Sequence, residues 1–410
     1  MAVIDLPRIR KDFPPLATKV AGKPLVYLDS ACMALKPRAV IDAVVDYYEN
    51  YPVCAERSVH RLSSKVSLMV DDVREQARAH FNAPSADEIV FLRNTTEGIN
   101  LVAHAFGLKR GDEVITGDKQ HNSNLAPWHL LRKQLGIRYT IVRSGQDGLF
   151  DLEALKEAVG PRTRLVSVGH TANLDGTSVP AREIAEVAHD KGAALLLDGA
   201  QSAPHRRVDL KRLDCDFFAC SLHKMCGPTG VGLLYGKGEH LARMEPLNPG
   251  GSTVVETTYK TATFLKPPRR FEGGLQDYAG ILGAGAALTY LDAIGMDEIQ
   301  GHGNGLNRRA TAALKGVKGV RVLGPPAASL RGPIFSFTVE GMDPHDIALA
   351  LDEVANISVR SGNHCVHSWM KAHGLKGSVR ASFYLYNTPQ AVKRALRASR
   401  SPSRASSRSA

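Results

Sequence analysis

The stretch LLLDGAQSAPHRRVDLKRLDCDFFACSLHKMCGPTGVGLLYG, residues 195–236, contains three apolar runs, with an acid at the end of the first and a lysine between the second and the third. The first run ends in Asp198, and Lys224 follows CSLH directly before a GPTG turn. Singly, Asp198 could cap a helix and Lys224 could be a surface charge. A carboxylate at the end of a leucine strand is nevertheless costly to bury without a cationic partner, because desolvation disfavours its charge. Asp198 and Lys224 together therefore indicate a functional site at the ends of these strands.

Residues 85–236 alternate short apolar runs with longer amphipathic segments such as TEGINLVAHAFG and AREIAEVAHDKG. Strands that alternate with helices predict an α/β fold with a largely parallel sheet covered on both faces. Ligands bind at the carboxyl ends of the strands in such sheets. The predicted strands are EIVFLR (88–93), EVITG (113–117), RYTIVR (138–143), RLVSVGH (164–170), ALLLDGA (194–200), DFFACS (216–221) and GVGLLYG (230–236).

The pattern changes after RRFEGG, residues 269–274. A long helix-compatible run is followed by three apolar runs, VRVLG, IFSFTVEG and ISVRSG, which predict the strands of a smaller α+β domain. We predict an N-terminal arm over residues 1–30 that packs on the small domain, a large domain over 31–285, a small domain over 286–397 and a disordered Ser/Arg tail over 398–410.

The net charge of +11 is concentrated at the C-terminus, where six basic residues leave only +5 on residues 1–392. The tail RASRSPSRASSRSA has no apolar residue larger than alanine, so burial cannot offset the entropy of ordering it. We expect a solvated terminus rather than an RNA-binding arm, and no nucleic-acid partner. The six basic residues are Lys393, Arg394, Arg397, Arg400, Arg404 and Arg408.

The sequence favours a reducing compartment without membrane association. No apolar run approaches the ~20 residues that span a bilayer, and MAVIDLPRIRKDFPPL lacks the charged-then-apolar layout of a secretory signal. Six cysteines are scattered without a CxxC pair, which favours free thiols over a disulfide framework or a zinc ribbon. We therefore expect a cytoplasmic location.

Cys365 lies between two histidines in RSGNHCVHSW, residues 360–369. It could belong to a metal site, be a reactive thiol or be an inert buried cysteine. Alternate residues of an extended loop point to opposite sides, and no other motif supplies the fourth ligand of a structural zinc, so we predict no metal. The preceding SGN indicates an exposed turn, and imidazole and guanidinium groups beside a thiol are typical of reactive cysteines.

The chain carries ten motifs in one order: YLDSACMALKP, RSVHRLS, RNTTEGINLVA, HNSNLAPW, HTANLDGT, LLLDGAQSAPH, CSLHKMCGPTGVGLLYG, RFEGG, RSGNHC and VRASFYLYNT. Together they resemble the fold-type I pyridoxal 5'-phosphate (PLP) enzymes of the class V aminotransferase family, and within it the SUF-type (group II) cysteine desulfurases and selenocysteine lyases. The resemblance extends from Tyr27 to Thr388. It implies a large domain with a mainly parallel seven-stranded sheet, a smaller α+β C-terminal domain, bound PLP and a homodimer.

The resemblance also implies how PLP is held. Lys224 bonds covalently to the cofactor and later moves the α-proton, Asp198 pairs with the pyridinium nitrogen, and Gln201 bonds the phenolic oxygen. His121 stacks on the ring. The phosphate lies at the N-terminus of the helix that begins near NTTEG, where backbone donors and the helix dipole favour an anion. The residues implied for the phosphate are Thr95, Thr96, Ser221 and His223.

On the substrate side, the resemblance assigns Arg380 to the α-carboxylate, for which its planar fork is suited. Asn173 and Arg360 match further active-site residues, although either arginine could instead be a structural ion-pair partner. The implied reaction converts L-cysteine to L-alanine. Cys365 takes the sulfur as a persulfide and delivers it to an acceptor, for iron–sulfur cluster assembly or other sulfur biosynthesis.

Other functions remain compatible with these residues. A selenocysteine lyase would use the same groups, and a class V transaminase, epimerase or C–S lyase would leave Cys365 incidental. A non-catalytic RNA-binding scaffold that uses the basic tail is a further alternative. The joint occurrence of four residues argues against a scaffold, because a scaffold needs no buried lysine with a counter-charge. The four are Lys224, Asp198, Gln201 and Arg380.

Three positions depart from the family pattern. Leu275 follows RFEGG where a threonine usually reaches the phosphate of the other subunit, so we expect weaker cofactor affinity or a rearranged phosphate site. The sequences NHCVHSW and HNSN also differ from the common forms. We expect these two differences to affect the acceptor or the substrate rather than the chemistry.

Overall fold

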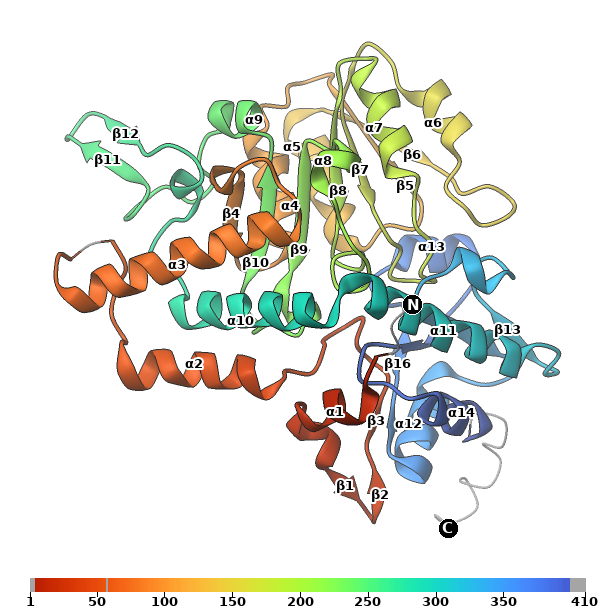
Figure 1. Ribbon diagram of the computed structural model, residues 1–410. Helices are drawn as coiled ribbons and strands as arrows, with labels where there is room; N and C mark the ends of the chain where they lie inside the picture. The colour runs from red at the N-terminus through yellow and green to blue at the C-terminus, as the bar shows by residue number, and fades with distance from the viewer. Residues whose placement is uncertain (1–3, 57, 399–410) are drawn as a thin grey trace.

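A seven-stranded sheet forms the centre of the computed structural model, which describes residues 4–56 and 58–398 (Figure 1). The strand order is β4-β10-β9-β8-β7-β5-β6, and all neighbours are parallel except β10, which is antiparallel to β4 and β9. This confirms the predicted α/β fold, and each predicted apolar run contains one strand. The strands are β4 (Ile89–Leu92), β5 (Glu113–Gly117), β6 (Arg138–Val142), β7 (Thr163–Gly169), β8 (Ala194–Asp198), β9 (Phe217–Ser221) and β10 (Gly232–Gly236).

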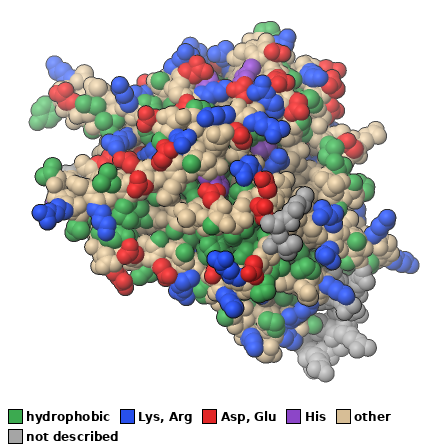
Figure 2. Space-filling model, in the orientation of Figure 1, with side chains coloured by type: hydrophobic (Ala, Val, Ile, Leu, Met, Phe, Trp, Pro, Cys, Tyr) green, Lys and Arg blue, Asp and Glu red, His purple; other side chains and the backbone are tan. Residues whose placement is uncertain are grey.

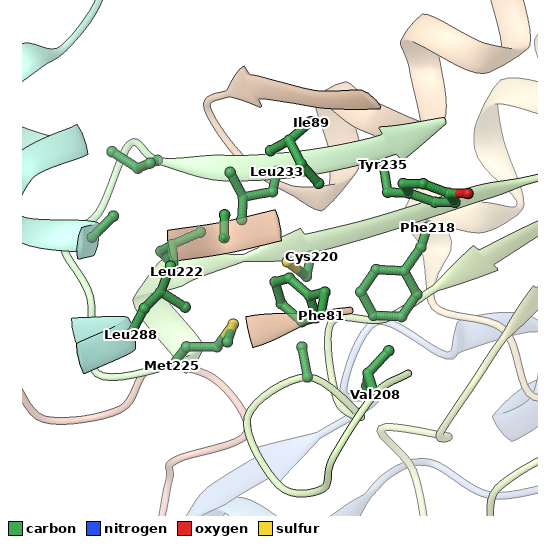
Figure 3. Close-up of a cluster of buried hydrophobic side chains, with 14 of the residues drawn as sticks. Phe81, Ile89, Val208, Phe218, Cys220, Leu222, Met225, Leu233, Tyr235 and Leu288 are labelled. Carbon is green, nitrogen blue, oxygen red and sulfur yellow. The ribbon is translucent and has the colours of Figure 1, made fainter. Parts of the chain in front are cut away.

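Both faces of this sheet are buried, which explains why its strands read as continuous apolar runs. In β8, Leu195 and Leu197 face one hydrophobic core and Leu196 faces another. Figure 3 shows part of the first core, where Phe218 and Cys220 of β9 point into it. The first core includes side chains of α1 (Leu6–Lys11), α2 (Arg38–Asn50), α3 (Arg61–His80), α6 (Leu152–Ala158), α7 (Ala181–His189), α8 (Leu210–Leu213) and α10 (Tyr278–Ile294). The second includes those of α4 (Thr95–Ala105), α5 (Ala126–Leu135) and α9 (Gly238–Arg243).

A smaller antiparallel sheet, in the order β13-β14-β17-β16, forms the α+β part near the C-terminus. Its β16 and β17 place Arg360 directly opposite Arg380. Strand β17 was not among the predicted strands. The elements are β13 (Val320–Val322), β14 (Ile334–Val339), β16 (Arg360–Gly362) and β17 (Ser378–Ser382), with α11 (Met296–Leu314), α12 (Pro344–Ala355), α13 (His367–Ala372) and α14 (Pro389–Ala398).

The N-terminal segment contacts residues near the C-terminus. Strand β3 (Val26–Tyr27) pairs in parallel with β15 (Ile357–Ser358), and Arg10 donates to the backbone oxygen of Tyr386 at 2.7 Å. The proposed domain boundary at residue 285 falls inside α10, so the domain bounds stay a prediction. The predicted tail lies outside the described residues except for Ala398. Two short hairpins complete the elements: β1 (Lys19–Val20) with β2 (Lys23–Pro24), and β11 (Val254–Thr257) with β12 (Ala262–Phe264).

Helix α10 is apolar on most sides because it is buried in the first core. Within residues 4–56 and 58–398, no single helix is long and apolar enough to cross a membrane. Helices α10 and α11 reach that length only as a pair, and they are bent by 75° relative to each other.

We expect the free energy of unfolding to fall as the pH drops below 6.5. Burial, together with nearby cationic side chains, lowers the pKa of His170, His205 and His364 from 6.5 to about 3. The unfolded chain binds protons on these imidazoles as the pH falls through 6.5, whereas the folded chain does not until near pH 3. Each histidine therefore removes about 1.4 kcal/mol of stability per pH unit in this window.

Urea unfolding of the cofactor-free protein, followed by circular dichroism at pH 7 and pH 5, measures this effect. The midpoint should be clearly lower at pH 5, and His170→Asn should reduce the difference. Equal midpoints at the two pH values would contradict the account.

Candidate active site

A cavity of about 610 Å³ opens at the carboxyl ends of β7, β8 and β9. Residues of the small sheet and of the loop after β16 form its other wall. All of the candidate residues line this one cavity, although they come from segments far apart in the sequence. They are Thr95, Thr96, His121, Asn173, Asp198, Gln201, Ser221, His223, Lys224, Arg360, Cys365 and Arg380.

Asp198 is the last residue of β8, and Lys224 follows the adjacent parallel strand β9. Asp198 is buried and accepts a hydrogen bond from the backbone N–H of Ala200 at 2.9 Å. Burial raises the pKa of this carboxyl, and the Ala200 bond and the Lys224 ammonium partly oppose that rise. Burial lowers the pKa of Lys224, with Asp198 acting in the opposite direction. The site thus contains a buried amine whose pKa is lowered and a buried carboxyl that forms no ion pair within the described residues.

The N-terminus of α4 forms an anion-binding corner of the cavity. The backbone N–H of Thr95 donates to Ser221 Oγ at 2.8 Å, and Thr95 Oγ1 lies 2.7 Å from the same atom. Thr96 is exposed, and its hydroxyl lies 2.7 Å from Ser123 Oγ. Burial lowers the pKa of His223 to about 4, so its ring is neutral at pH 7. Hydroxyls at a helix N-terminus suit a phosphate.

His121 is held as a neutral ring. The backbone N–H of Ser123 donates to His121 Nδ1 at 3.1 Å, so Nδ1 is an acceptor and the ring proton is on Nε2. Burial and then Lys224 and Arg380 lower the pKa of His121 to about 4. A neutral aromatic ring in this wall is suited to stacking on a planar ligand.

Arg380 is buried at 3% exposure and is only partly paired. Its Nη1 donates to the backbone oxygen of Asn173 at 3.0 Å, and its Nη2 lies 3.6 Å from Asp29 Oδ1. Its Nε has no hydrogen-bond partner within the described part of the chain. Arg360 is half-exposed and pairs with Asp29 at 2.8 Å, so the predicted ion-pair alternative for Arg360 has a partner here. Arg380 is the better placed of the two to bind a carboxylate.

Cys365 lies exposed on the loop between β16 and α13. The loop is tightly turned, because His364 and Cys365 have φ values of 49° and 58°. It is anchored by the backbone N–H of Asn122, which donates to the Cys365 oxygen at 2.7 Å, and by Asn173 Nδ2, which donates to the His364 oxygen at 2.6 Å. The thiol is therefore presented at the cavity by a fixed backbone.

The neighbouring histidines have other partners. His364 Nε2 lies 2.8 Å from Ser378 Oγ, and His367 Nδ1 lies 2.8 Å from Asn122 Nδ2. No group of three or more His, Cys, Asp or Glu side chains that could hold a metal ion occurs among residues 4–56 and 58–398.

The profile of the family described as aminotransferase class-V matches residues 26–395. The chain belongs to the class-V aminotransferase family. A probable cysteine desulfurase from Halalkalibacterium halodurans is 42% identical to it over 94% of each protein, and a cysteine desulfurase from Haloferax volcanii is 38% identical over 95% of each. The apo structure of a cysteine desulfurase from Thermococcus onnurineus NA1 aligns with a TM-score of 0.91 at 35% identity, over 97% of this chain and 98% of that one.

Three residues near the family motifs contribute to the site but were not assigned a role from the sequence. Asp29 and Cys32 lie in YLDSACMALKP, and Ser123 lies in HNSNLAPW. Asp29 pairs with Arg360, Cys32 lines the cavity, and Ser123 joins Thr96 to His121. Of the three, only Asp29 in YLDS could have been recognised from the sequence, since an isolated carboxylate after an apolar run needs a partner.

Gly232→Ala should weaken PLP binding. A Cβ at Gly232 would lie 2.6 Å from Asn94 Cα and 2.8 Å from Cys220 O, which are backbone atoms. Asn94 caps α4, so the start of that helix must shift. We expect an increase of about tenfold to a hundredfold in the PLP dissociation constant, measured by absorbance titration of the apoprotein.

Gly236→Ala is the matched control on the same strand. Its Cβ would meet the end of the Leu241 side chain, away from the cavity, so it should affect stability but not PLP affinity. An unchanged dissociation constant in Gly232→Ala would show that α4 tolerates the shift.

Proposed function

We propose that this member of the family is a PLP-dependent cysteine desulfurase that converts L-cysteine to L-alanine. The observation that carries the proposal is the cavity itself. It brings together Lys224, Asp198, the α4 anion corner, the partly paired Arg380 and an exposed thiol at Cys365. The cysteine desulfurase relatives, which align over nearly their whole length, support the same function.

The residues present fit PLP. Asp198 would face a protonated ring nitrogen, which would supply the cation that this buried carboxyl lacks. Gln201 Oε1 is buried without a partner in the described residues and is available to a ring substituent. Thr95, Thr96, Ser221 and His223 would hold the phosphate. When bound through Lys224, PLP supplies a ring that accepts the electrons released at the substrate Cα.

The chain's own residues account for the remaining steps. Arg380 binds the α-carboxylate and orients the amino acid, and the neutral amine of Lys224 takes the proton from Cα. The Cys365 thiolate attacks the substrate sulfur, so that a bond between the two sulfurs forms as the Cβ–S bond breaks. The electron pair of the broken bond stays on Cβ, which takes up a proton to become the methyl group of alanine. The products are L-alanine and a persulfide on Cys365. His121 covers the ring as the neutral form that its pKa of about 4 maintains.

Arg380→Lys should raise the KM for L-cysteine about tenfold or more, because a lysine cannot reproduce the paired guanidinium bonds to a carboxylate. Steady-state kinetics measure it. Arg360→Lys is the control: Arg360 is half-exposed and already paired with Asp29, so its effect should be smaller. Equal effects of the two changes would contradict the assignment of the carboxylate to Arg380.

The direct test of the proposed function is to mix the PLP-loaded protein with L-cysteine and a thiol reductant and to measure alanine. Repeated turnover supports the proposal, and absence of alanine overturns it. A parallel assay with L-selenocysteine separates desulfurase from lyase, because a strong preference for selenocysteine would favour the lyase.

We further propose that the enzyme is a homodimer that delivers sulfur to a partner protein. Large exposed apolar side chains gather on α2, α3 and the β11–β12 hairpin, and Figure 2 shows hydrophobic side chains on this side of the molecule. Sedimentation of the full chain tests the dimer: a monomer mass at micromolar concentration would contradict it. The exposed residues are Val45 and Tyr48 of α2, Leu62 and Leu68 of α3, Val255 of β11, and Tyr259 in the turn between β11 and β12.

A further inference from the structure

A second thiol, Cys32, lines the active-site cavity together with Cys365. It is partly exposed, unlike Cys215, Cys220 and Cys226, which are buried. Burial raises the pKa of the Cys220 and Cys226 thiols to about 12, which makes those cysteines inert. Cys32 is thus the one cysteine besides Cys365 that the described chain presents to the cavity.

The turn that carries Cys32 is fixed to the cavity wall. The backbone N–H of Ala31 donates to Ser382 Oγ at 2.8 Å, and Gln201 Nε2 donates to the Ala31 oxygen at 2.7 Å. The Cys32 N–H closes the turn by donating to the Asp29 oxygen at 3.0 Å. The thiol is therefore held in place and does not depend on a mobile loop.

The segments that carry the two thiols are joined. Asp29, three residues before Cys32, pairs at 2.8 Å with Arg360, five residues before Cys365. Both thiols line the cavity that also contains the Lys224 amine. The two cysteines thus approach the reacting centre from adjoining walls.

The cavity between these walls contains buried polar atoms that are free to bind a ligand. Arg380 Nε and Gln201 Oε1 are buried without a hydrogen-bond partner in the described residues, and both side chains line the cavity. Gln201 also holds the Cys32 turn, and Arg380 lines the same cavity as Cys32.

We propose that Cys32 is a second sulfur-carrying site, which takes the outer sulfur from the Cys365 persulfide. The proposal rests on the proposed desulfurase function. The Cys32 thiolate attacks the outer sulfur, a new S–S bond forms at Cys32, and the bond between that sulfur and Cys365 Sγ breaks. The electron pair leaves on Cys365 Sγ, which becomes a thiolate again. The exchange neither oxidises nor reduces the protein and needs no further reactant.

The consequence is a capacity of two sulfur atoms per subunit. Once Cys32 holds the first sulfur, Cys365 is free to attack a second L-cysteine. Without an acceptor or a reductant, the enzyme should release two alanines per subunit and then stop.

The test uses the PLP-loaded full chain with about three equivalents of L-cysteine per subunit, without oxygen or any other thiol or reductant, so that little free thiol remains to accept the sulfur. Alanine is counted per subunit, and the thiols are then alkylated and mapped by mass spectrometry. We expect two alanines and one added sulfur on each of Cys32 and Cys365. Cys32→Ala should release one alanine, and Cys54→Ala, which changes a half-exposed cysteine away from the cavity, should still release two.

Other outcomes overturn the proposal in distinguishable ways. One alanine with sulfur on Cys365 alone excludes the transfer while leaving the desulfurase function intact. A Cys32–Cys365 disulfide with released hydrosulfide shows attack on the inner sulfur instead. Added sulfur on Cys32 in Cys365→Ala shows that Cys32 reacts with substrate directly. Absence of alanine from the wild-type protein removes the desulfurase function and this inference with it.

Discussion

Lys224→Ala is expected to abolish the conversion of L-cysteine to alanine, with a loss of about a thousandfold or more. Lys224 has two roles, since it bonds to PLP and takes the Cα proton. Its amine is buried, and burial lowers its pKa, which favours the neutral form that a base requires. The other lysines of the described cavity wall are Lys119, which pairs with Asp175, and Lys376, which is exposed.

The measurement combines alanine formation with the absorbance of the protein-bound cofactor. Lys224→Ala should lose both the activity and the absorbance band of PLP bonded to lysine. Lys376→Ala is the matched control, because Lys376 lines the same cavity but is exposed, and it should keep the band. Loss of the band in both variants, or in neither, would contradict the assignment.

Cys365→Ala should reduce alanine formation about a hundredfold, which corresponds to about 2.7 kcal/mol of transition-state stabilisation. The thiol is exposed at the cavity mouth on a backbone held by Asn122 and Asn173. The cofactor site does not depend on it, so the PLP absorbance should be unchanged.

If Cys365→Ala keeps the activity of the wild-type protein, a different class V reaction in which Cys365 is incidental would be favoured. Cys54→Ala controls for the loss of a cysteine as such. Cys365→Ser is informative as well, because a hydroxyl cannot form a persulfide, so serine should be as inactive as alanine.

The large sheet was predictable because both of its faces are buried. Leu195 and Leu197 pack on one side and Leu196 on the other, so the run needs no polar alternation and is readily recognised. Strand β17 alternates instead: Val379 and Ala381 enter the small-domain core, while Arg380 serves the cavity. The alternation of apolar and polar residues within SVRAS, residues 378–382, is typical of a strand and could have predicted β17.

The site was predictable where a residue type is unusual in its local sequence. Asp198 after a leucine strand is such a case, and the resemblance to the family supplied the other roles. The contacts of Asp29 with Arg360 and Arg380 could not be predicted, because they join segments more than three hundred residues apart. The placement of Cys32 in the same cavity as Cys365 depends on the same long-range contacts.

The measurement that tests the central claim most directly is a mass analysis of the Cys365 peptide after a single turnover. The PLP-loaded Cys32→Ala variant is mixed with one equivalent of L-cysteine without reductant, so that sulfur cannot move on to Cys32. The account predicts one alanine per subunit and one added sulfur on Cys365. Alanine released with an unmodified Cys365, or no alanine at all, would contradict it.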